Sequence, residues 1–312
     1  MPKVSVVIPV YNTEKFLTRC LNSVLSQSVQ DFEAICINDG STDGSLKILE
    51  EYASKDQRIK VISQENKGQS AARNRAMPEI SGDYVFFLDS DDFIHPQTFE
   101  ILLNVAEKTG CAVVSTTETK QYGGDKSYNT DDLQFTVHQE PLKHILTTNI
   151  ASSSVIWNKL YKTELVRNRP FIEGIYFEDW PWVTCLFAGL NQYAVVPYAL
   201  NGYNTENEST MRSAFNVRKI NDYVTGIKAV QDFFAEPKYA SLWPVVRAKR
   251  IGASIKMMIN KTYHEKSGQP DLNKYLSNRL NELHKEKAFC YFNLPMKTLW
   301  RLAKIQMRLR GK

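Results

Sequence analysis

The chain has 312 residues, of which 43% are hydrophobic and 23% are charged, and its formal net charge is +5. A chain of this length can bury a large core, so we expect either one large domain with an appendage or two domains. The composition is that of a globular protein, and so mild a positive charge gives no reason to expect a nucleic-acid partner.

Other features of the sequence indicate a cytoplasmic protein. The first residues do not have the pattern of a signal peptide, and no apolar run reaches the roughly 18 residues that a membrane-spanning helix needs. The cysteines are dispersed, without a CxxC pair or a zinc-binding spacing. Such a set is typical of free thiols in a reducing compartment.

In chain order, short apolar runs alternate with helical periodicity up to Thr116. Strands are expected at Val4–Ile8, Phe32–Ile37, Ile59–Ile62, Asp83–Leu88 and Cys111–Thr116. The helices between them are expected at Glu14–Gln27, Ser45–Tyr52, Ala71–Ile80 and Thr98–Lys108. This alternation predicts an α/β fold with a doubly wound, mainly parallel sheet, and the apolar strands indicate that both of its faces are covered.

The second half of the chain departs from this alternation. Residues 122–136 are polar and turn-rich, which predicts a hairpin or a loop. Later periodic stretches predict a helical C-terminal region, with helices at Asn216–Phe234, Leu242–Lys261 and Asp271–Phe289. We therefore expect a first domain at residues 1–212 and a helical region at residues 213–312.

Polar clusters follow three of the predicted strands. They are Pro9–Asn12, Asn38–Asp43 and Asp89–Asp92, at the carboxyl ends of the first, second and fourth strands. Open α/β sheets bind ligands at that edge, so the three clusters together predict a binding site. Taken singly, Asp39 also fits a turn residue, and Asp92 fits a turn residue or a helix cap.

The carboxylates of the last cluster indicate a bound cation, because like charges so close to one another repel. The sequence has neither a P-loop nor a GxGxxG motif after the first strand, so a bound diphosphate would need another means of neutralisation. Mg²⁺ or Mn²⁺ held by the carboxylates would provide it. Lys67 and Arg73 add positive charge at a loop-to-helix junction, unless they lie on a solvated helix face.

Four motifs carry a family resemblance: IPVYN (Ile8–Asn12), INDGSTDGS (Ile37–Ser45), NKGQSAARN (Asn66–Asn74) and LDSDD (Leu88–Asp92). In this order and spacing they resemble the family 2 glycosyltransferases of the GT-A fold, with a looser similarity through WNKLY (Trp157–Tyr161) and FEDW (Phe177–Trp180). The resemblance implies an inverting, metal-dependent transferase that uses a nucleotide-diphosphate sugar, usually a UDP-sugar. Residues 1–110 would bind this donor, and residues 111–212 would bind the acceptor and supply the catalytic base.

The same resemblance assigns roles to individual residues. Asp39 would hydrogen-bond the uracil, Asp89 would lie toward the sugar side of the nucleotide, and Asp91, with Asp89, would hold Mn²⁺ or Mg²⁺. The full set of nucleotide-binding residues would be Pro9, Val10, Tyr11, Asn12, Asp39, Lys67, Gly68, Arg73, Asp89, Ser90 and Asp91. Since no histidine is a clear metal ligand, the metal shell beyond Asp91 stays open.

The reaction also needs a base, because a sugar hydroxyl is a poor nucleophile until its proton is accepted. By the resemblance Asp179 is this base, with Glu178 as the second candidate. The alternative is that both are first-turn acids favoured by the helix dipole. The neighbouring Trp180 and Trp182 suit sugar stacking or a place in the core.

One departure from the family pattern follows the last sheet strand. Relatives often carry a tyrosine–arginine pair there, whereas this chain has Gly202-Tyr203-Asn204. Either Arg212 replaces the missing arginine or this chain has no equivalent of it.

The C-terminal segment Met296–Lys312 contains six basic residues and no acidic one. At helical spacing Lys297, Arg301, Lys304 and Arg308 form one stripe, opposite Leu299, Leu302, Ile305 and Leu309, with Trp300 at the edge. Such a helix suits peripheral contact with anionic lipids on the inner face of the plasma membrane. Alternatively, it docks on its own domain with its basic face in water.

The resemblance further implies a glycan or lipid-linked glycan acceptor in the biosynthesis of capsule, lipopolysaccharide or another cell-surface polysaccharide. A rival enzyme would deliver the sugar to a polyprenyl phosphate, which is already an anion and needs no base. Other rivals are a catalytically silent sugar-nucleotide-binding protein and, more distantly, a nucleotidyltransferase. Neither the donor sugar nor the oligomeric state follows from the sequence.

Overall fold

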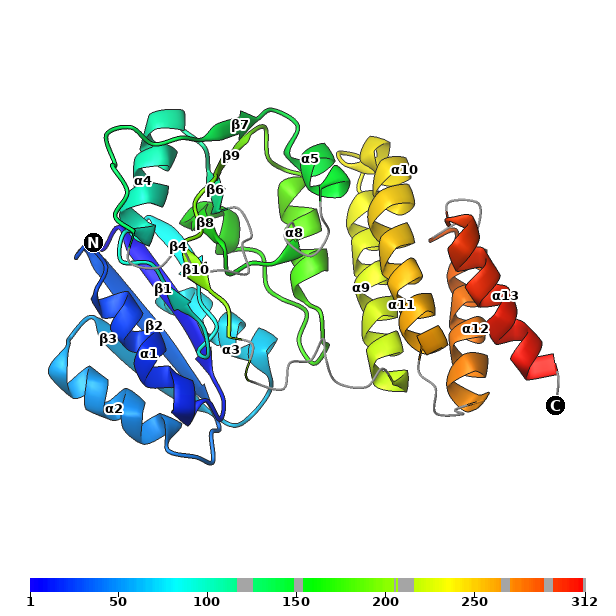
Figure 1. Ribbon diagram of the computed structural model, residues 1–312, viewed down its shortest axis with the longest axis horizontal. Coiled ribbons are helices and arrows are strands. Elements are labelled where there is room, and N and C mark those ends of the chain that lie inside the picture. Colours follow the sequence, from blue (N-terminus) through cyan, green and yellow to red (C-terminus); the bar gives the residue numbers. More distant parts are fainter. Residues whose placement is uncertain are drawn as a thin grey trace. The chain divides into compact units, whose positions relative to one another are not determined.

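A computed structural model describes residues 1–116, 126–148, 154–204, 206, 216–264, 270–288 and 294–310 (Figure 1). Its main sheet has eight strands in the order β3-β2-β1-β4-β8-β6-β9-β7, and β5 and β10 form a separate antiparallel pair. The strands are β1 (Val4–Val10), β2 (Phe32–Asp39), β3 (Ile59–Gln64), β4 (Tyr84–Phe87), β5 (Phe93–Ile94), β6 (Val113–Thr116), β7 (Thr136–His138), β8 (Lys159–Lys162), β9 (Tyr193–Val196) and β10 (Asn201–Gly202).

The first half of the sheet is parallel, as the sequence predicts. β1 pairs in parallel with both β2 and β4, and β2 pairs in parallel with β3. The five expected strands are all present, but β8 lies between β4 and β6 and runs antiparallel to both. The strand β8 has only four residues and begins and ends with lysine, so it carries no apolar run that would have predicted it.

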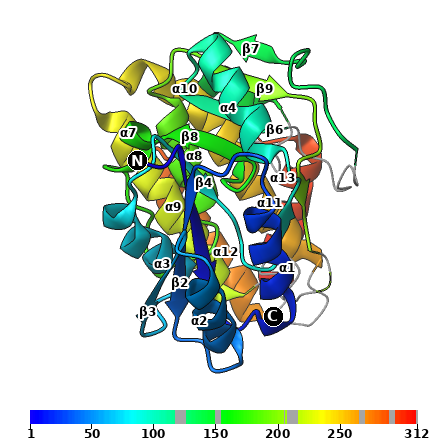
Figure 2. The same cartoon turned by 90° about the vertical axis from the view of Figure 1, so that its left-hand side faces the viewer.

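Helices cover both faces of this sheet. They are α1 (Glu14–Leu25), α2 (Ser45–Lys55), α3 (Gln69–Ala76), α4 (Thr98–Thr109) and the short α7 (Thr163–Val166), with a 3₁₀ turn at Met77–Glu79. α1 and α3 lie on opposite sides of β1 and β2 (Figure 2). α1 buries Leu17, Cys20, Leu21 and Val24, whose spacing places them on one helix face.

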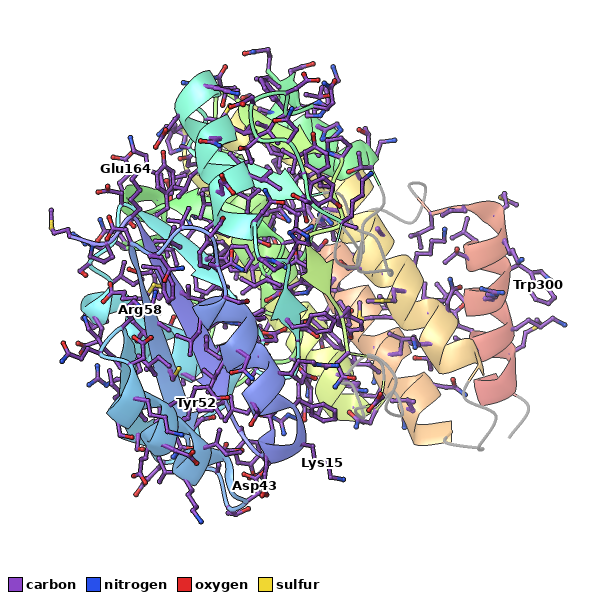
Figure 3. All side chains as sticks on the ribbon, turned by 60° about the vertical axis from the view of Figure 1, so that its left-hand side comes forward. Lys15, Asp43, Tyr52, Arg58, Glu164 and Trp300 are labelled. Atoms are coloured by element: carbon purple, nitrogen blue, oxygen red, sulfur yellow. The ribbon has the colours of Figure 1, made fainter. Side chains whose placement is uncertain are left out.

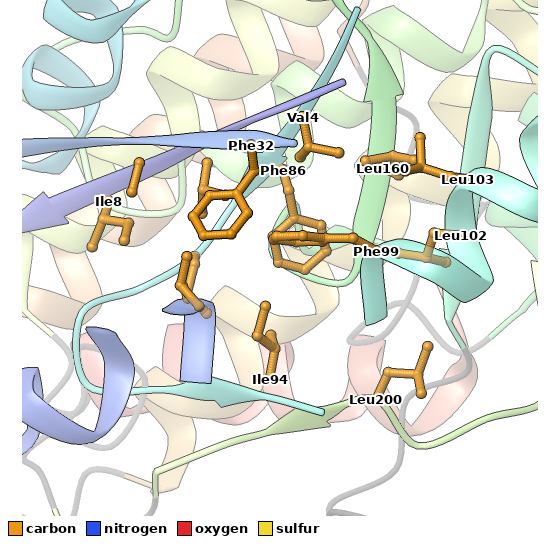
Figure 4. Close-up of a cluster of buried hydrophobic side chains, with 14 of the residues drawn as sticks. Val4, Ile8, Phe32, Phe86, Ile94, Phe99, Leu102, Leu103, Leu160 and Leu200 are labelled. Carbon is orange, nitrogen blue, oxygen red and sulfur yellow. The ribbon is translucent and has the colours of Figure 1, made fainter. Parts of the chain in front are cut away.

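The core on the α1 side combines alternate residues of the strands with residues of α1 and α4 (Figure 4). Val4, Val6, Ile8 and Val10 of β1 belong to it and are fully buried. The ring of Phe99 on α4 meets Phe86 edge to face, with ring centroids 5.7 Å apart. This packing fixes the strands whose carboxyl ends carry the polar clusters.

The chain forms two compact units. Unit 1 comprises residues 1–141, 155–174 and 189–207 and contains the sheet; unit 2 comprises residues 142–154, 175–188 and 208–312. The described helices of unit 2 are α5 (Pro141–Thr147, from its second residue), α8 (Asp179–Phe187), α9 (Val217–Ala235), α10 (Trp243–Val246), α11 (Gly252–His264), α12 (Pro270–Lys285) and α13 (Met296–Arg310). A 3₁₀ turn at Ala240–Leu242 precedes α10, and a π-helical turn at Arg247–Ile251 follows it.

The expected C-terminal helices are therefore confirmed. The domain boundary that we expected at residue 212 falls in the segment 207–215, outside the described residues, and it stays a prediction. No helix in the described part of the chain combines the length and the apolar character that crossing a bilayer requires.

α13 packs inside unit 2 by its apolar side. Leu302 and Ile305 are buried, and the guanidinium Nη1 of Arg301 donates to Oδ1 of Asn260 on α11 at 2.6 Å. Trp300, which the sequence placed at the edge of this side, instead points into solvent (Figure 3). Leu302 and Ile305, two members of the apolar group on the helical wheel, thus serve packing within unit 2, as the docked alternative requires.

Candidate functional site

The three polar clusters meet at one edge of the sheet. β1, β2 and β4 are neighbours and run in parallel, so Val10, Asp39 and Phe87 end at the same side. We call this side the carboxyl edge. The hydroxyl of Thr13 donates to Oγ of Ser90 at 3.0 Å, which joins the segment after β1 to the segment after β4.

The segment after β1 is also bonded to the segment after β2. The backbone N–H of Asn12 donates to Oγ of Ser41 at 3.2 Å, and the N–H of Thr42 donates back to Oδ1 of Asn12 at 2.8 Å. Asn12 has a φ of 51°, a left-handed conformation that asparagine tolerates better than most residues. These bonds connect the first two clusters as the sequence analysis expected.

Not all residues of the first cluster expose a side chain. Pro9 and Val10 are buried within β1, whereas Asn12 is exposed and Tyr11 keeps 48% of its surface accessible. Tyr11 therefore offers the one aromatic ring of this cluster to a ligand at the carboxyl edge. The contribution of Pro9 and Val10 would be to shape the backbone.

Asp39 is buried and organises the loop after β3. Its Oδ1 accepts hydrogen bonds from the backbone N–H of Lys67 at 2.9 Å and from Nε2 of Gln64 at 2.7 Å, and its Oδ2 accepts one from the N–H of Gly68 at 2.8 Å. Asp39 is thus more than a turn residue, because it fixes the loop that carries Lys67. Its expected bond to uracil stays a prediction.

Gly40 permits this close approach. It has a φ of +71°, and a Cβ atom there would lie 2.8 Å from the backbone nitrogen of Asn66. Both the left-handed conformation and the nearby backbone exclude a larger residue. The glycine of the INDG sequence is therefore required by the geometry of the two loops.

Arg73 and Asp89 form an ion pair at the same edge. Nη2 of Arg73 lies 3.0 Å from Oδ1 of Asp89, and Nε2 of Gln69 donates to the same oxygen at 2.7 Å. The Arg73 side chain is 1% exposed and its guanidinium lies 5.4 Å from the Phe171 ring centroid. The alternative of a solvated helix face is therefore wrong for Arg73, although Lys67 is exposed.

The turn that carries the aspartates is held from outside by Arg19. Nη2 of Arg19 donates to the backbone oxygen of Asp91 at 3.0 Å, and its guanidinium lies 4.5 Å from the centroid of the Phe93 ring. That ring packs on Gly202, where a Cβ atom would lie 2.2 Å from it. These contacts define the backbone of the DSDD turn.

Asp92 is the most unusual carboxylate of the turn. It is 3% exposed, and its Oδ1 accepts a hydrogen bond from the backbone N–H of Asn204 at 2.7 Å. Its Oδ2 is buried and accepts no hydrogen bond from the described part of the chain. Burial, together with the nearby Asp89 and Asp91, raises the pKa of Asp92 to about 8.

Asp92 belongs to the turn, since its N–H donates to the backbone oxygen of Asp89 at 3.0 Å. It does not cap the following helix, because Gln97 occupies the N-cap position of α4. Of the two alternatives for this residue, the turn is confirmed and the cap is wrong.

The side chains of this turn suit a divalent cation that takes few of its ligands from the protein. Its carboxylates suit Mg²⁺ or Mn²⁺, and a bound cation would relieve the repulsion among Asp89, Asp91 and Asp92 that raises the pKa of Asp92. Within the described segments, however, no three His, Cys, Asp or Glu side chains gather into a metal-binding group. One or two carboxylates would therefore hold the ion, with phosphate oxygens and water completing its shell, an arrangement typical of Mg²⁺.

The two candidate bases lie in unit 2, at the start of α8. The helix begins at Asp179, and Glu178 occupies its N-cap position without capping it. Glu178 is 7% exposed, whereas Asp179 is only partly buried. Trp180 and Trp182 are both buried, which favours the core alternative over sugar stacking.

The structure adds residues that the sequence analysis did not single out. Gln64, Gln69, Arg19 and Thr13 all bond the loops of the carboxyl edge, as described above. Gln69 lies inside the NKGQSAARN motif, so that motif was its only signal. Tyr203 is 41% exposed and stacks on Trp157 with ring centroids 5.9 Å apart, whereas Arg212 lies outside the described residues.

Comparison with protein families gives one match that covers more than half of the chain. The family described as Glycosyl transferase family 2 matches residues 5–174. Among curated proteins, the uncharacterized glycosyltransferase EpsJ of Bacillus subtilis is 34% identical over 220 residues, or 68% of this chain and 63% of EpsJ. For the related EpsH of the same organism the match spans 48% of its length, so the chain covers about half to two thirds of these relatives.

Solved structures share the fold at lower identity. Residues 1–349 of Staphylococcus aureus TarS superpose with a TM-score of 0.69 at 20% identity, covering 99% of this chain and 91% of that one. Their complex with UDP-GlcNAc has a TM-score of 0.62. The mannosyltransferase PcManGT of Pyrobaculum calidifontis, in complex with GDP-Man and Mn²⁺, has a TM-score of 0.56 at 15% identity and covers 98% of this chain and 80% of that one.

Proposed function

The chain belongs to glycosyl transferase family 2, and from this premise we propose that it transfers a sugar from a nucleoside-diphosphate donor to a hydroxyl group with inversion at the anomeric carbon. The donor is a UDP-sugar, and the acceptor is a glycan or a lipid-linked glycan of a cell-surface polysaccharide. One observation carries the proposal: three polar clusters of adjacent parallel strands form a single bonded network at the carboxyl edge.

The carboxyl edge offers complementary groups for each part of a sugar nucleotide. Tyr11 provides an exposed ring for the base, and the loop held by Asp39 carries the exposed Lys67. The fold likeness to TarS, solved with UDP-GlcNAc, supports a donor of this class. Asp89, anchored by Arg73 and Gln69, would accept hydrogen bonds on the sugar side of the nucleotide.

The turn at Asp89–Asp92 would hold Mn²⁺ or Mg²⁺ through Asp91 and Asp89. When bound, the ion stabilises the negative charge that builds on the departing diphosphate. The turn itself prepares the site, because Arg19 and Asn204 fix its backbone and one of its carboxylates before any ligand arrives. The fold likeness to a mannosyltransferase solved with Mn²⁺ supports this use of the turn.

Asp179 would act as the general base of a single displacement. The acceptor oxygen forms a bond to the anomeric carbon while the bond from that carbon to the diphosphate oxygen breaks on the opposite face. The proton of the acceptor hydroxyl passes to the Asp179 carboxylate. Asp179 is preferred to Glu178 because it is the more exposed of the two, and a base must reach the acceptor.

The test is a panel of sugar nucleotides assayed for nucleoside-diphosphate release with Mn²⁺, Mg²⁺ or EDTA. We expect slow, metal-dependent release of UDP from one donor in the absence of acceptor, and faster release once a suitable glycan is added. Release of pyrophosphate would identify a nucleotidyltransferase instead. UDP binding without turnover on any donor and acceptor would favour a silent binding protein.

The proposal includes peripheral contact with the inner face of the plasma membrane through α13. The side of the helix opposite the packed residues exposes Met296 at 80%, Trp300 at 53% and Met307 at 53%. Figure 3 shows the Trp300 side chain pointing away from the helices. Lys297 and Lys304 lie along one side of this stripe, and the ammonium group of Lys304 lies 5.2 Å from the Trp300 ring centroid. An exposed apolar stripe with a tryptophan and basic flanks suits the interface of an anionic bilayer.

This contact can be tested by sedimentation with vesicles of phosphatidylcholine, with and without phosphatidylglycerol. We expect binding only to the anionic vesicles, weakened about tenfold by Lys297→Glu with Lys304→Glu and by Trp300→Ala. Lys15→Glu on α1 is the matched control, since this exposed lysine lies in unit 1. Equal sedimentation of all variants, or none of the wild type, would contradict the contact.

A further inference from the structure

The segment before the proposed base has a strained backbone. Phe177 has a φ of 65°, one of three non-glycine residues in the described segments with a positive φ. A bulky residue in this conformation is strained and persists only where the surrounding structure holds it. Phe177 immediately precedes Glu178 and Asp179, so whatever holds Phe177 also sets where the first turn of α8 begins.

Helix α9 supplies the contacts that hold this segment. The Phe177 ring stacks on Tyr223, with ring centroids 4.4 Å apart and an interplanar angle of 22°. Tyr223 is itself 2% exposed, and its hydroxyl contacts Sδ of Met257 at 3.4 Å, so it is a fixed platform. The stack offers a physical reason why Phe177 keeps its left-handed conformation.

Tyr176, the residue before Phe177, is held by Asp222, the residue before Tyr223 on α9. The backbone N–H of Tyr176 donates to Oδ2 of Asp222 at 3.1 Å, and Asp222 is 7% exposed. The guanidinium of Arg218, one turn earlier on α9, lies 4.6 Å from the centroid of the Tyr176 ring. Both the backbone and the ring of Tyr176 are therefore fixed by one helix.

The first turn of α8 rests on the same face of α9. At Gly226 an added Cβ atom would lie 2.8 Å from Cζ2 of Trp180, so only glycine lets the indole ring come this close. Asp222, Tyr223 and Gly226 have the spacing i, i+1, i+4, which places them on one side of the helix. They contact residues 176, 177 and 180, on both sides of the acidic pair.

We propose that Asp222, Tyr223 and Gly226 are positioning residues for the base Asp179. They fix the backbone on both sides of Asp179, so that its carboxylate is oriented before the acceptor binds. This inference rests on the proposed function, because it takes Asp179 as the base. Misplacement of a reacting group by about 1 Å can lower a rate on the order of 100-fold, so small shifts of this segment should be visible in turnover.

The test compares Tyr223→Leu, which removes the stack, with Tyr223→Phe, which keeps it. We expect Tyr223→Leu to lower kcat by about 10- to 100-fold with little change in KM for the donor or in UDP affinity. Tyr223→Phe should stay within about twofold of wild type. A second pair, Asp222→Leu and Asp222→Asn, repeats the comparison, since asparagine keeps an oxygen that can accept the Tyr176 N–H.

A lower kcat in the leucine variant than in the conservative variant of each pair, with unchanged UDP affinity, would support the inference. If Tyr223→Leu does not fold, the Asp222 pair and Gly226→Ala decide, and thermal denaturation identifies that case. Wild-type kcat in Tyr223→Leu and Asp222→Leu, or equal losses within each pair, would overturn it. Asp179→Asn separates the two claims: an active Asp179→Asn enzyme refutes the base itself, whereas an inactive one with a normal Tyr223→Leu enzyme refutes only the positioning.

Discussion

The buried carboxylates at the two ends of the parallel strands differ in how many hydrogen bonds they accept. At the amino end, Glu33 of β2 accepts hydrogen bonds from Oγ of Ser5 at 2.6 Å and from the N–H and hydroxyl of Ser81 at 2.8 and 2.7 Å, and Nζ of Lys60 lies 2.5 Å away. At the carboxyl edge, Asp92 accepts a single hydrogen bond and keeps one buried oxygen unsatisfied.

The pKa directions follow from this difference. Burial alone would raise the pKa of Glu33, but the hydrogen bonds from Lys60, Ser5 and Ser81 hold it below its usual value. Burial and two neighbouring aspartates raise the pKa of Asp92. The hydrogen bonds therefore stabilise the anion of Glu33 in the fold, whereas burial and crowding disfavour the anion of Asp92 unless a cation binds nearby.

The largest expected effect is a loss of transfer activity. Asp91→Asn and Asp179→Asn should each lower transfer by about 10³-fold or more, because one would lose a metal ligand and the other the base. Turnover should be measured with the donor found by the panel assay. Glu33→Gln is the matched control and should transfer at the wild-type rate at a temperature where it is folded.

Only Asp91→Asn should also weaken metal-dependent UDP binding. Near-normal turnover in Asp179→Asn would show that Asp179 is not the base. Turnover that survives loss of both Glu178 and Asp179 would point to an acceptor that is already an anion, such as a polyprenyl phosphate.

The second effect is on stability at the amino end. Glu33→Gln should lower the free energy of unfolding at pH 7 by about 2 kcal/mol, because charge-assisted hydrogen bonds are lost in a buried place. Since the pKa of folded Glu33 lies below its unfolded value, the wild-type advantage is full above the unfolded pKa and is lost as the pH falls through the folded pKa. Urea unfolding at pH 7 and pH 4 tests this, and an equal difference at both pH values would contradict it.

The smallest expected effect is a gain, rather than a loss, in the free energy of unfolding, and it comes from a substitution at the carboxyl edge. Asp92→Asn keeps an acceptor for the Asn204 N–H and removes a buried charge, so in EDTA at pH 8 it should stabilise the protein on the order of 1–2 kcal/mol. Because the folded pKa of Asp92 is raised to about 8, its contribution to wild-type stability is full below the unfolded pKa and is lost as the pH rises toward 8. The gain should vanish near pH 4, and destabilisation at pH 8 would contradict this account.

The sequence could predict what depends on local patterns. Apolar runs and helical spacing located β1, β2, β3, β4 and β6 and the helices between them, and the order of parallel strands then placed three polar clusters at one edge. It could not predict β8, because a KLYK strand is buried only through its neighbours β4 and β6. Antiparallel insertions of this kind are decided by tertiary packing.

The same limit applies to the site. The sequence motifs identified Asp39 and Arg73 as ligand-binding residues. They could not show that Asp39 also holds the loop after β3 through two backbone N–H groups, because those bonds form only when β2 and the loop come together in the fold. On α13 the helical wheel placed Trp300 at the edge of the apolar side, and only packing shows that Leu302 is buried and the tryptophan exposed. The left-handed Phe177 has no sequence signal, and the residue on which its ring stacks, Tyr223 of α9, lies far from it in the chain.

The central claim is that the carboxyl edge is a metal-dependent nucleotide site, and calorimetric titration with UDP tests it most directly. The proteins are wild type, Asp91→Asn and Glu33→Gln, each with Mn²⁺ and with EDTA. We predict at least tenfold tighter binding with Mn²⁺ for wild type and Glu33→Gln, and no gain from Mn²⁺ for Asp91→Asn. Equal UDP affinity in all six titrations, or no binding in any, would contradict the account.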